Sequence, residues 1–562
     1  MKELRTKDFI IIGTFIIFLI FLLSVNYKNK NINLVSGLDW SHFPGATVSD
    51  RGIYFKPLGR EIVHSDGSVG QLNPPLNLNS HIEIDGDFKI TFSLSEIDNQ
   101  ASFRLYSKPP IIYDEWRYES PSVDINFDAV KNIITVRIWN GISSGPTDMR
   151  VYDVSIESKV DITFEYTENQ IIFFKNGRVL GSIPNHDIFE SGQIWFGADS
   201  TILGRGWTLS KLNIQSLNGG SVRLIQAPSF DLGKSNPDSL RYLAGINFRK
   251  IKIGSAISIG RLFADEQYRN LVLSQFSIMT PENSMKPQFI HPQPNVYVFE
   301  ESDQLVDIAL MNDMKVHGHT LVYAKSSPLW MTKSRREDRQ KIMVDHIEKV
   351  VNHFKGRVSE WDVVNEVFSK KNVLYKNWGT GLDHNIWFDA MGENYIDLAF
   401  ETAHKADPQA KLYLNDYGVE RDGQHWEALL ALVKRLKQRN VPIDGVGFQA
   451  HVYNDGDYFD ANQLKNHMDV LAELGLLVRI SEIDVTGDDA QEQINQYVLA
   501  LDVCLKASNC TSYTTWGSTD LYGSTTRSDR YPLVYGTSLL WDKDMKPKPA
   551  YKALQERLRR SY

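Results

Sequence analysis

From about residue 240 to the C-terminus, short apolar runs alternate with longer segments in which apolar residues recur every three or four positions. The short runs predict buried parallel strands and the longer segments predict amphipathic helices. The predicted strands are Lys252 to Ile257, Phe276 to Thr280, Lys315 to Thr320, Val358 to Val364, Lys411 to Asn415, Gly445 to His451, Leu477 to Ile480 and Ser512 to Gly517. The predicted helices include Arg339 to Phe354, Tyr395 to Ala406, Trp426 to Arg439, Leu464 to Leu474, Gln491 to Lys506 and Ala550 to Leu558. Eight such units in about 320 residues predict an α/β fold, a (β/α)8 TIM barrel. The alternative is a doubly wound open sheet, but no G-x-G-x-x-G follows the first strand.

The pattern between about Val35 and Ser216 is different, because short alternating strands follow one another without a helical period. The predicted strands include Phe88 to Leu94, Ser122 to Phe127, Ile133 to Trp139, Asp161 to Tyr166 and Gln170 to Lys175. This pattern is typical of an antiparallel β-sandwich. The run I-I-F-F-K-N-G-R-V-L-G-S predicts a hairpin that turns at Asn176-Gly177. Together with I-W-F-G-A-D-S, it resembles the laminin-G or concanavalin A-like lectin sandwich.

Turn-forming residues separate the two patterns. Gly219, Gly220, Pro228, Gly233 and Pro237 predict a linker. The predicted organisation is therefore a cytoplasmic tip and anchor at 1–30, the sandwich at 31–217, the linker at 218–239 and the barrel at 240–562.

Residues 9–25 contain no charge and are preceded by Lys2, Arg5 and Lys7. A segment of about 17 apolar residues is at the lower limit for a transmembrane helix. The basic residues favour a cytoplasmic N-terminus, so we expect a single-pass cell-membrane protein with an extracellular catalytic domain. The alternative is a cleaved signal peptide and a secreted protein, but no A-x-A-like cleavage site follows the segment.

Composition narrows the possible functions. The formal net charge is −8 and no basic stripe is evident, which argues against nucleic acid as a partner. Two cysteines are too few for a disulfide scaffold. The sequence shows no metal-ligand cluster or phosphate-binding loop, so we expect neither a metal nor a cofactor.

Polar residues gather at the predicted strand ends, and this pattern points to chemistry. Glu366 follows the fourth strand, and Glu482 with Asp484 follows the seventh. Barrel active sites form at the carboxyl ends of the strands. Two carboxylates at that face suit glycoside hydrolysis, with one as proton donor and one as nucleophile. The other strand ends carry Glu282, Asn283, His317, His319, Asn365, Asn415, Asp416, Gln449, His451, Trp516 and Asp520.

Several ordered motifs resemble family 10 of the glycoside hydrolases, chiefly retaining endo-β-1,4-xylanases, from about Leu240 to the C-terminus. These motifs are W-D-V-V-N-E, S-E-I-D-V, H-G-H-T-L-V, N-D-Y, V-P-I-D-G-V-G-F-Q-A-H and P-K-P-A-Y. The resemblance implies that Glu366 is the acid/base and Glu482 the nucleophile. It also implies support from His451, Asp484, Asn365 and Gln449, and sugar binding by Glu282, Asn283, Lys286, His319, Tyr323 and Trp516. A disulfide between Cys504 and Cys510 is similar to one in many family members, although two buried free thiols are the alternative.

The chain departs from the family around the binding cleft. Tyr323 and Ala324 stand where the family commonly has Trp-His, and Pro287 replaces a common tryptophan. The segment after Asp520 also lacks a tryptophan. The expected substrate is xylan, with two alternatives: hydrolysis of another β-1,4-glycan, or a surface protein that binds glycan without catalysis.

A second glycan site is predicted in the sandwich. The segment Y-D-E-W-R-Y places Tyr113, Trp116 and Tyr118 beside Asp114 and Arg117. Aromatic faces next to hydrogen-bonding groups suit sugar binding. The alternative is that the sandwich is only a spacer. Trp139 and Trp195 occupy alternating strand positions, where burial is expected.

Overall fold

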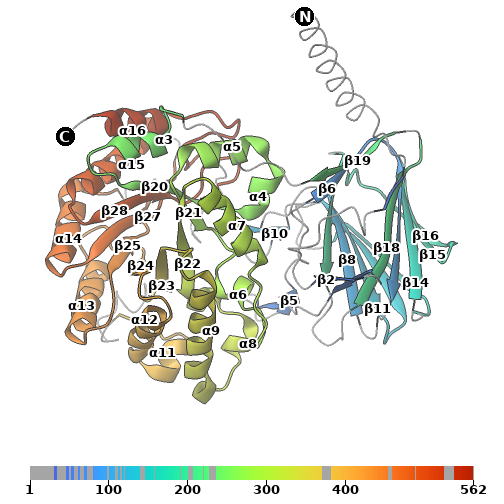
Figure 1. The fold of residues 1–562 in the computed structure, drawn as a ribbon, viewed down its shortest axis with the longest axis horizontal. Coiled ribbons are helices and arrows are strands. Elements are labelled where there is room, and N and C mark those ends of the chain that lie inside the picture. Colours follow the sequence, from blue (N-terminus) through green and yellow to red (C-terminus); the bar gives the residue numbers. More distant parts are fainter. Residues whose placement is uncertain are drawn as a thin grey trace, which may run out of the picture. The chain divides into compact units, whose positions relative to one another are not determined.

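The chain divides into two compact units in a computed structural model (Figure 1). One unit comprises Met1–Gly59 and Asn73–Pro228, and the other comprises Arg60–Leu72 and Ser229–Tyr562. The residues that the structure describes are 31–33, 46–49, 52–55, 61–63, 69–71, 80–95, 97, 100–107, 112–113, 117–118, 121–139, 146–156, 159–189, 192–199, 207–218, 220–226, 236–369, 381–452, 458–487, 489–523 and 537–560. The predicted membrane segment at residues 9–25 lies outside them and stays a prediction. Within the described part of the chain, no helix has the length and apolar character needed to cross a membrane.

The first unit contains two antiparallel sheets, as predicted for this region. One sheet has the order β16-β15-β14-β7-β18-β3-β2, with β1 paired to β18, and the other has the order β13-β12-β11-β8-β17-β6-β19. The strands of the first sheet are β1 Asn31–Asn33, β2 Ala46–Ser49, β3 Gly52–Phe55, β7 Phe88–Ser95, β14 Lys159–Tyr166, β15 Gln170–Lys175, β16 Arg178–Pro184 and β18 Trp207–Ser216. Those of the second are β6 Ser80–Ile84, β8 Gln100–Tyr106, β11 Ser122–Asp128, β12 Ile133–Trp139, β13 Asp148–Asp153, β17 Gln193–Asp199 and β19 Val222–Gln226.

Apolar residues from both sheets form one hydrophobic cluster, which includes Phe92, Phe103 and Phe164. Side chains alternate between the two faces of a strand. Ile194 and Phe196 belong to the cluster, so Trp195 between them faces the opposite side of its sheet. Trp195 is nevertheless only 1% exposed. Its predicted burial is therefore confirmed, although it lies on the face away from this cluster.

The predicted hairpin turn is confirmed. Lys175 of β15 pairs with Arg178 of β16, and both Asn176 and Gly177 have positive φ angles, of 47° and 78°. Two-residue hairpins favour this backbone geometry because it matches the twist of the strands.

Two further segments bear on the predicted boundaries and the second glycan site. Strand β19 pairs with β6, so the second sheet extends into the segment predicted as a linker. In the predicted glycan segment, β9 (Ile112–Tyr113) pairs with β10 (Arg117–Tyr118). Asp114 and Trp116 lie outside the described residues, so the second glycan site stays a prediction.

The second unit is a barrel of parallel strands. Its sheet runs in the order β25-β24-β23-β22-β21-β20-β28-β27-β26, and a pairing between β25 and β27 closes it. The strands are β20 Lys252–Ile257, β21 Ile278–Pro281, β22 Lys315–Val322, β23 Glu360–Asn365, β24 Lys411–Asp416, β25 Gly445–Phe448, β26 His451–Val452, β27 Leu477–Val485 and β28 Cys510–Thr515. The predicted (β/α)8 barrel is confirmed. The hairpin β4–β5 (Glu61–Val63 and Val69–Gln71) belongs to the same compact unit.

Helices surround the barrel sheet (Figure 1). They are α3 Leu240–Ile246, α4 Ile259–Ala264, α5 Glu266–Gln275, α6 Pro287–Ile290, α7 Glu300–Met311, α8 Leu329–Thr332, α9 Arg339–Phe354, α11 Ile386–Met391, α12 Asn394–Ala406, α13 Gln424–Gln438, α14 Ala461–Glu473, α15 Ala490–Lys506 and α16 Pro549–Arg559. Helix α9 has the predicted bounds and buries one apolar face, with Met343, Ile347, Val350, Val351 and Phe354. Asp460 and Asp489 cap α14 and α15 by accepting hydrogen bonds from backbone N–H groups of the first turn.

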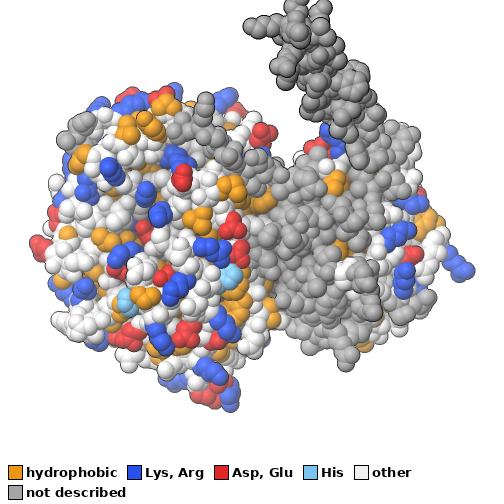
Figure 2. Space-filling view, in the orientation of Figure 1, with side chains coloured by type: hydrophobic (Ala, Val, Ile, Leu, Met, Phe, Trp, Pro, Cys, Tyr) orange, Lys and Arg blue, Asp and Glu red, His pale blue; other side chains and the backbone are white. Residues whose placement is uncertain are grey.

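Charged side chains of both signs lie on the surface of the barrel unit. Figure 2 shows lysine and arginine interspersed with aspartate and glutamate on the face that it presents. On this face the charges are mixed and are not gathered into a patch of one sign.

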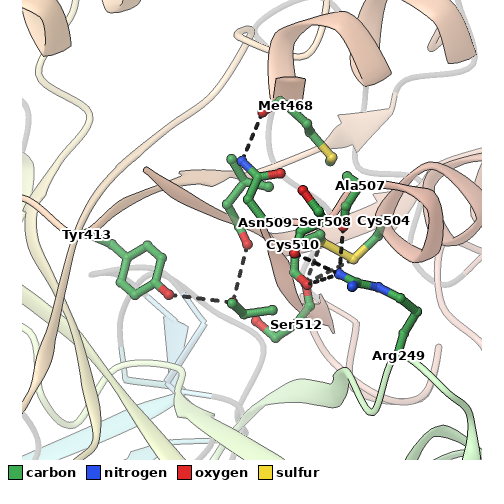
Figure 3. Close-up of a disulfide and its surroundings, with 11 residues drawn as sticks. Arg249, Tyr413, Met468, Cys504, Ala507, Ser508, Asn509, Cys510 and Ser512 are labelled. Carbon is green, nitrogen blue, oxygen red and sulfur yellow. Dashed lines mark hydrogen bonds between the residues drawn. A yellow bond between two sulfur atoms is a disulfide. The ribbon is translucent and has the colours of Figure 1, made fainter. Parts of the chain in front are cut away.

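The disulfide between Cys504 and Cys510 is present, as the resemblance implied, and it joins the end of α15 to the start of β28 (Figure 3). The enclosed loop is held from outside as well. Arg249 Nη2 donates to the carbonyl oxygens of Ala507, at 2.7 Å, and Ser508, at 3.0 Å. Asn509 Nδ2 donates to the Met468 carbonyl at 2.9 Å. These contacts fix the chain as it enters the last strand of the barrel.

Candidate active site

Strand β23 ends at Asn365 and places Glu366 immediately beyond the sheet. Glu366 has a φ of 53°, an uncommon left-handed conformation for a residue with a side chain. Its backbone N–H donates to the Asn415 carbonyl of the neighbouring strand at 2.9 Å. This bond holds the turn that carries the Glu366 side chain off the end of the strand.

Glu482 lies within β27 and is 5% exposed. Asn415 Nδ2 donates to its Oε1 at 2.6 Å, and His451 Nε2 lies 3.3 Å from its Oε2. Burial tends to raise the pKa of this carboxyl, but the His451 hydrogen bond and the nearby charges of His319 and His451 lower it below its usual value. Glu482 is therefore held as a buried carboxylate.

His451 bridges two carboxylates. Its Nδ1 lies 2.8 Å from Asp484 Oδ1, while its Nε2 faces Glu482. Burial tends to lower the His451 pKa, but Asp484 and Glu482 raise it well above the usual value. The imidazole is therefore a cation at neutral pH, and both of its nitrogens are donors. The predicted trio of His451, Asp484 and Glu482 is brought together.

Glu366 has a different set of neighbours. The Tyr323 hydroxyl hydrogen-bonds to its carboxyl group, Gln449 Nε2 lies 3.4 Å from its Oε1, and the Lys325 ammonium contacts its Oε2. Burial, followed by the charge of Glu366, raises the Tyr323 pKa well above its usual value. The hydroxyl is therefore protonated and acts as a donor. Tyr323 and Gln449 were predicted for this site, and Lys325 was not.

Asn415 connects the two glutamates; the sequence placed it at a strand end but predicted no role for it. Its carbonyl oxygen accepts from the Glu366 backbone, and its side-chain amide donates to Glu482 and, at 2.9 Å, to Asn365 Oδ1. The Ser481 hydroxyl donates to Asn415 Oδ1 at 2.6 Å and orients the amide. Its position at the end of a strand and in N-D-Y was the available signal.

Two of the predicted sugar-binding residues lie beside Trp516, and a third contacts one of them. His319 lies 5.3 Å from the Trp516 ring, and Lys286 Nζ lies 5.9 Å from it. Lys286 also donates to Asn283 Oδ1 at 2.9 Å. Glu282 differs, because its carboxyl lies 3.9 Å from Arg261 Nη1. Glu282 is therefore paired with a buried arginine.

The carboxylate of Asp362 orients His319. Asp362 Oδ2 lies 2.9 Å from His319 Nδ1, and its Oδ1 lies 2.8 Å from His317 Nε2. His317 Nδ1 in turn lies 3.1 Å from Glu360 Oε2. This buried chain directs the other nitrogen of His319 away from Asp362. Asp362 and Glu360 were not predicted, because carboxylates inside an apolar run give no sign of their partners.

The described residues were also compared with the ligand sets of metal sites. Among the residues that the structure describes, no group of three His, Cys, Asp or Glu side chains is placed to hold a metal ion.

The barrel unit is similar in sequence and in fold to known xylanases. Endo-1,4-beta-xylanase B of Thermotoga neapolitana is 36% identical over 300 residues, which cover 52% of this chain and 83% of that protein. Beta-1,4-xylanase of Dictyoglomus thermophilum is 36% identical over 320 residues, covering 53% of this chain and 86% of that protein. The crystal structure of xylanase 10B from Thermotoga petrophila RKU-1 in complex with xylobiose superimposes with a TM-score of 0.53 and 34% identity, over 58% of this chain and 98% of that one.

The model of glycosyl hydrolase family 10 matches residues 239–557, which is more than half of the chain and the whole of the barrel sheet. The chain therefore belongs to glycosyl hydrolase family 10.

Proposed function

We propose that this glycoside hydrolase is a retaining endo-β-1,4-xylanase. The observation that carries the proposal is that Asn415 of β24 contacts both glutamates, Glu366 just beyond β23 and Glu482 in β27, and that His451 holds Glu482 ionised. An ionised buried carboxylate suits a nucleophile, and a second carboxyl group suits a proton donor. The xylanase relatives and the xylobiose complex of a similar barrel support xylan as the substrate.

In the proposed mechanism, Glu366 donates a proton to the glycosidic oxygen while Glu482 attacks the anomeric carbon. The C–O bond to the leaving sugar breaks, and an ester forms between the sugar and Glu482. Glu366, now ionised, takes a proton from water as the water attacks the same carbon. The ester bond breaks, Glu482 is restored as a carboxylate, and the product keeps the β configuration.

The anomeric configuration of the first product tests this proposal. During hydrolysis of linear β-1,4-xylan, proton NMR is expected to show β-xylooligosaccharide before mutarotation forms the α-anomer. Initial α-product would contradict a double displacement. Turnover of cellulose but not of xylan would favour the alternative β-1,4-glycan, and no turnover of either would favour a glycan-binding protein without catalysis.

The two glutamates should respond differently to activated substrates. We expect Glu482→Ala to abolish turnover of every substrate, because no ester forms. Glu366→Ala should still release the phenol from a nitrophenyl xylobioside, since a good leaving group needs little protonation, and azide should restore turnover. Stopped-flow release of nitrophenol measures both effects. Glu473→Ala, at the exposed end of α14, is the control and should behave as the wild type. Equal loss in both variants without azide rescue would refute the assigned roles.

His451 should set the acidic limb of the pH profile. The His451 cation lowers the Glu482 pKa, so His451→Asn should raise it. Since Glu482 acts in its ionised form, activity would then be lost at a higher pH as the solution is acidified. We expect the acidic limb of kcat/KM on a nitrophenyl xylobioside to move upward by about one pH unit. His404→Asn, on the exposed side of α12, is the matched control. An unchanged limb would exclude this electrostatic role.

We also propose that the enzyme acts outside the cell while anchored by residues 9–25. The uncharged segment and the basic residues before it support this location. In intact cells, a protease added outside should digest the barrel, and carbonate extraction should leave the chain in the membrane fraction. Release into the medium after removal of the first 25 to 30 residues would support secretion.

A further inference from the structure

Lys325 is the residue at this site that the reaction does not explain. It lies in a 3-10 turn, η1 (Ala324–Ser326), directly after β22, and its side chain is 62% exposed. Its ammonium contacts Glu366 Oε2 and lies 5.7 Å from the centre of the Tyr417 ring. The charge of Lys325 also lowers the pKa of Asp383, which burial raises overall. A flexible cation therefore lies directly beside the predicted acid/base.

This contact conflicts with the first chemical step. Lys325, Tyr323 and Gln449 all donate to Glu366, an arrangement suited to a carboxylate that accepts hydrogen bonds. For proton donation, the carboxyl group must turn an O–H toward the glycosidic oxygen. An ammonium has three donors and no acceptor, so it cannot accept that proton. Lys325 is therefore displaced from Oε2 when that oxygen carries the proton to be donated.

The group that the Lys325 ammonium binds after it leaves Glu366 determines which substrate is favoured. Xylan backbone hydroxyls are neutral, so exchanging Glu366 for a hydroxyl would lose a charge-assisted hydrogen bond. Lys325 also lowers the pKa of Asp383, but burial raises that pKa overall and makes Asp383 a poorer carboxylate partner. A carboxylate on the substrate would keep the charge-assisted bond and draw the ammonium off Glu366. The exposed, flexible side chain gives Lys325 the freedom to follow such a group.

We propose that Lys325 is a specificity-determining residue that binds the carboxylate of an acidic branch, such as a uronic acid, on one of the two sugars joined by the scissile bond. The inference rests on the proposed hydrolysis of xylan and adds a preferred substrate class to it. The branch pairs with Lys325 and leaves Glu366 to donate its proton. No bond forms or breaks at Lys325.

The test compares glucuronoxylan with the same polymer after chemical reduction of its carboxyl groups, so that the two substrates differ in charge and not in branching. At low ionic strength, kcat/KM of the full-length wild type should be about three- to tenfold higher on the native polymer. In Lys325→Met the ratio should fall to about one, and in Lys325→Arg it should remain above one because the cation is kept. The wild-type preference should also fall as salt is raised.

Lys341→Met is the matched control, because it removes the same charge from an exposed position on α9. It should keep the wild-type ratio. A wild-type ratio of one, or an unchanged ratio in Lys325→Met, would overturn the role of Lys325 while leaving xylan hydrolysis intact. Equal slowing of Lys325→Met on both polymers would mean that the lysine acts on Glu366 alone. No hydrolysis of either polymer would refute the xylanase function and this inference with it.

Discussion

The charge on Glu482 is the constraint on which the rest of the site depends. Removing a carboxylate from water is costly unless donors replace the lost hydration. Here the donors come from different strands, Asn415 from β24 and His451 from β26. They can converge on β27 because the pairing of β25 with β27 closes the sheet. A small displacement of these strands would leave a buried charge without partners.

Each donor to Glu482 is itself held by a further polar group. Asp484 fixes the orientation and the charge of His451. The Ser481 hydroxyl donates to the Asn415 side chain and orients its amide. Asn415 also takes part in the geometry at Glu366, because its carbonyl binds the backbone of that left-handed residue. Strained backbone conformations persist where surrounding contacts fix them. One asparagine therefore relates the positions of both glutamates, and its replacement would disturb them together.

The amino-acid pattern was sufficient for the barrel because its strands are apolar runs bounded by helices with a clear stripe. Strand β20 and helix α9 have the predicted bounds. Glu366 and Glu482 could also be located, because polar residues at the end of a buried strand stand out. The pattern could not show that β19 continues the sheet after Gly219-Gly220, since a short strand is stabilised by its partner β6 and not by its own residues. The contacts of Asp362 and Lys325 could not be predicted for a similar reason, because their partners, His319 and Glu366, lie far away in the sequence.

The two carboxyl groups also present an electrostatic problem that Lys325 and His451 solve in different ways. Like charges close together disfavour simultaneous ionisation. The His451 side chain is only 10% exposed and bridges Glu482 to Asp484, so its charge is fixed in place. Lys325 is exposed and joined to η1 by a flexible side chain, so its charge can move. In the proposed mechanism, a fixed cation suits Glu482, which carries its negative charge whenever it is not esterified. In the same mechanism, a movable cation suits Glu366, whose charge appears and disappears in each catalytic cycle.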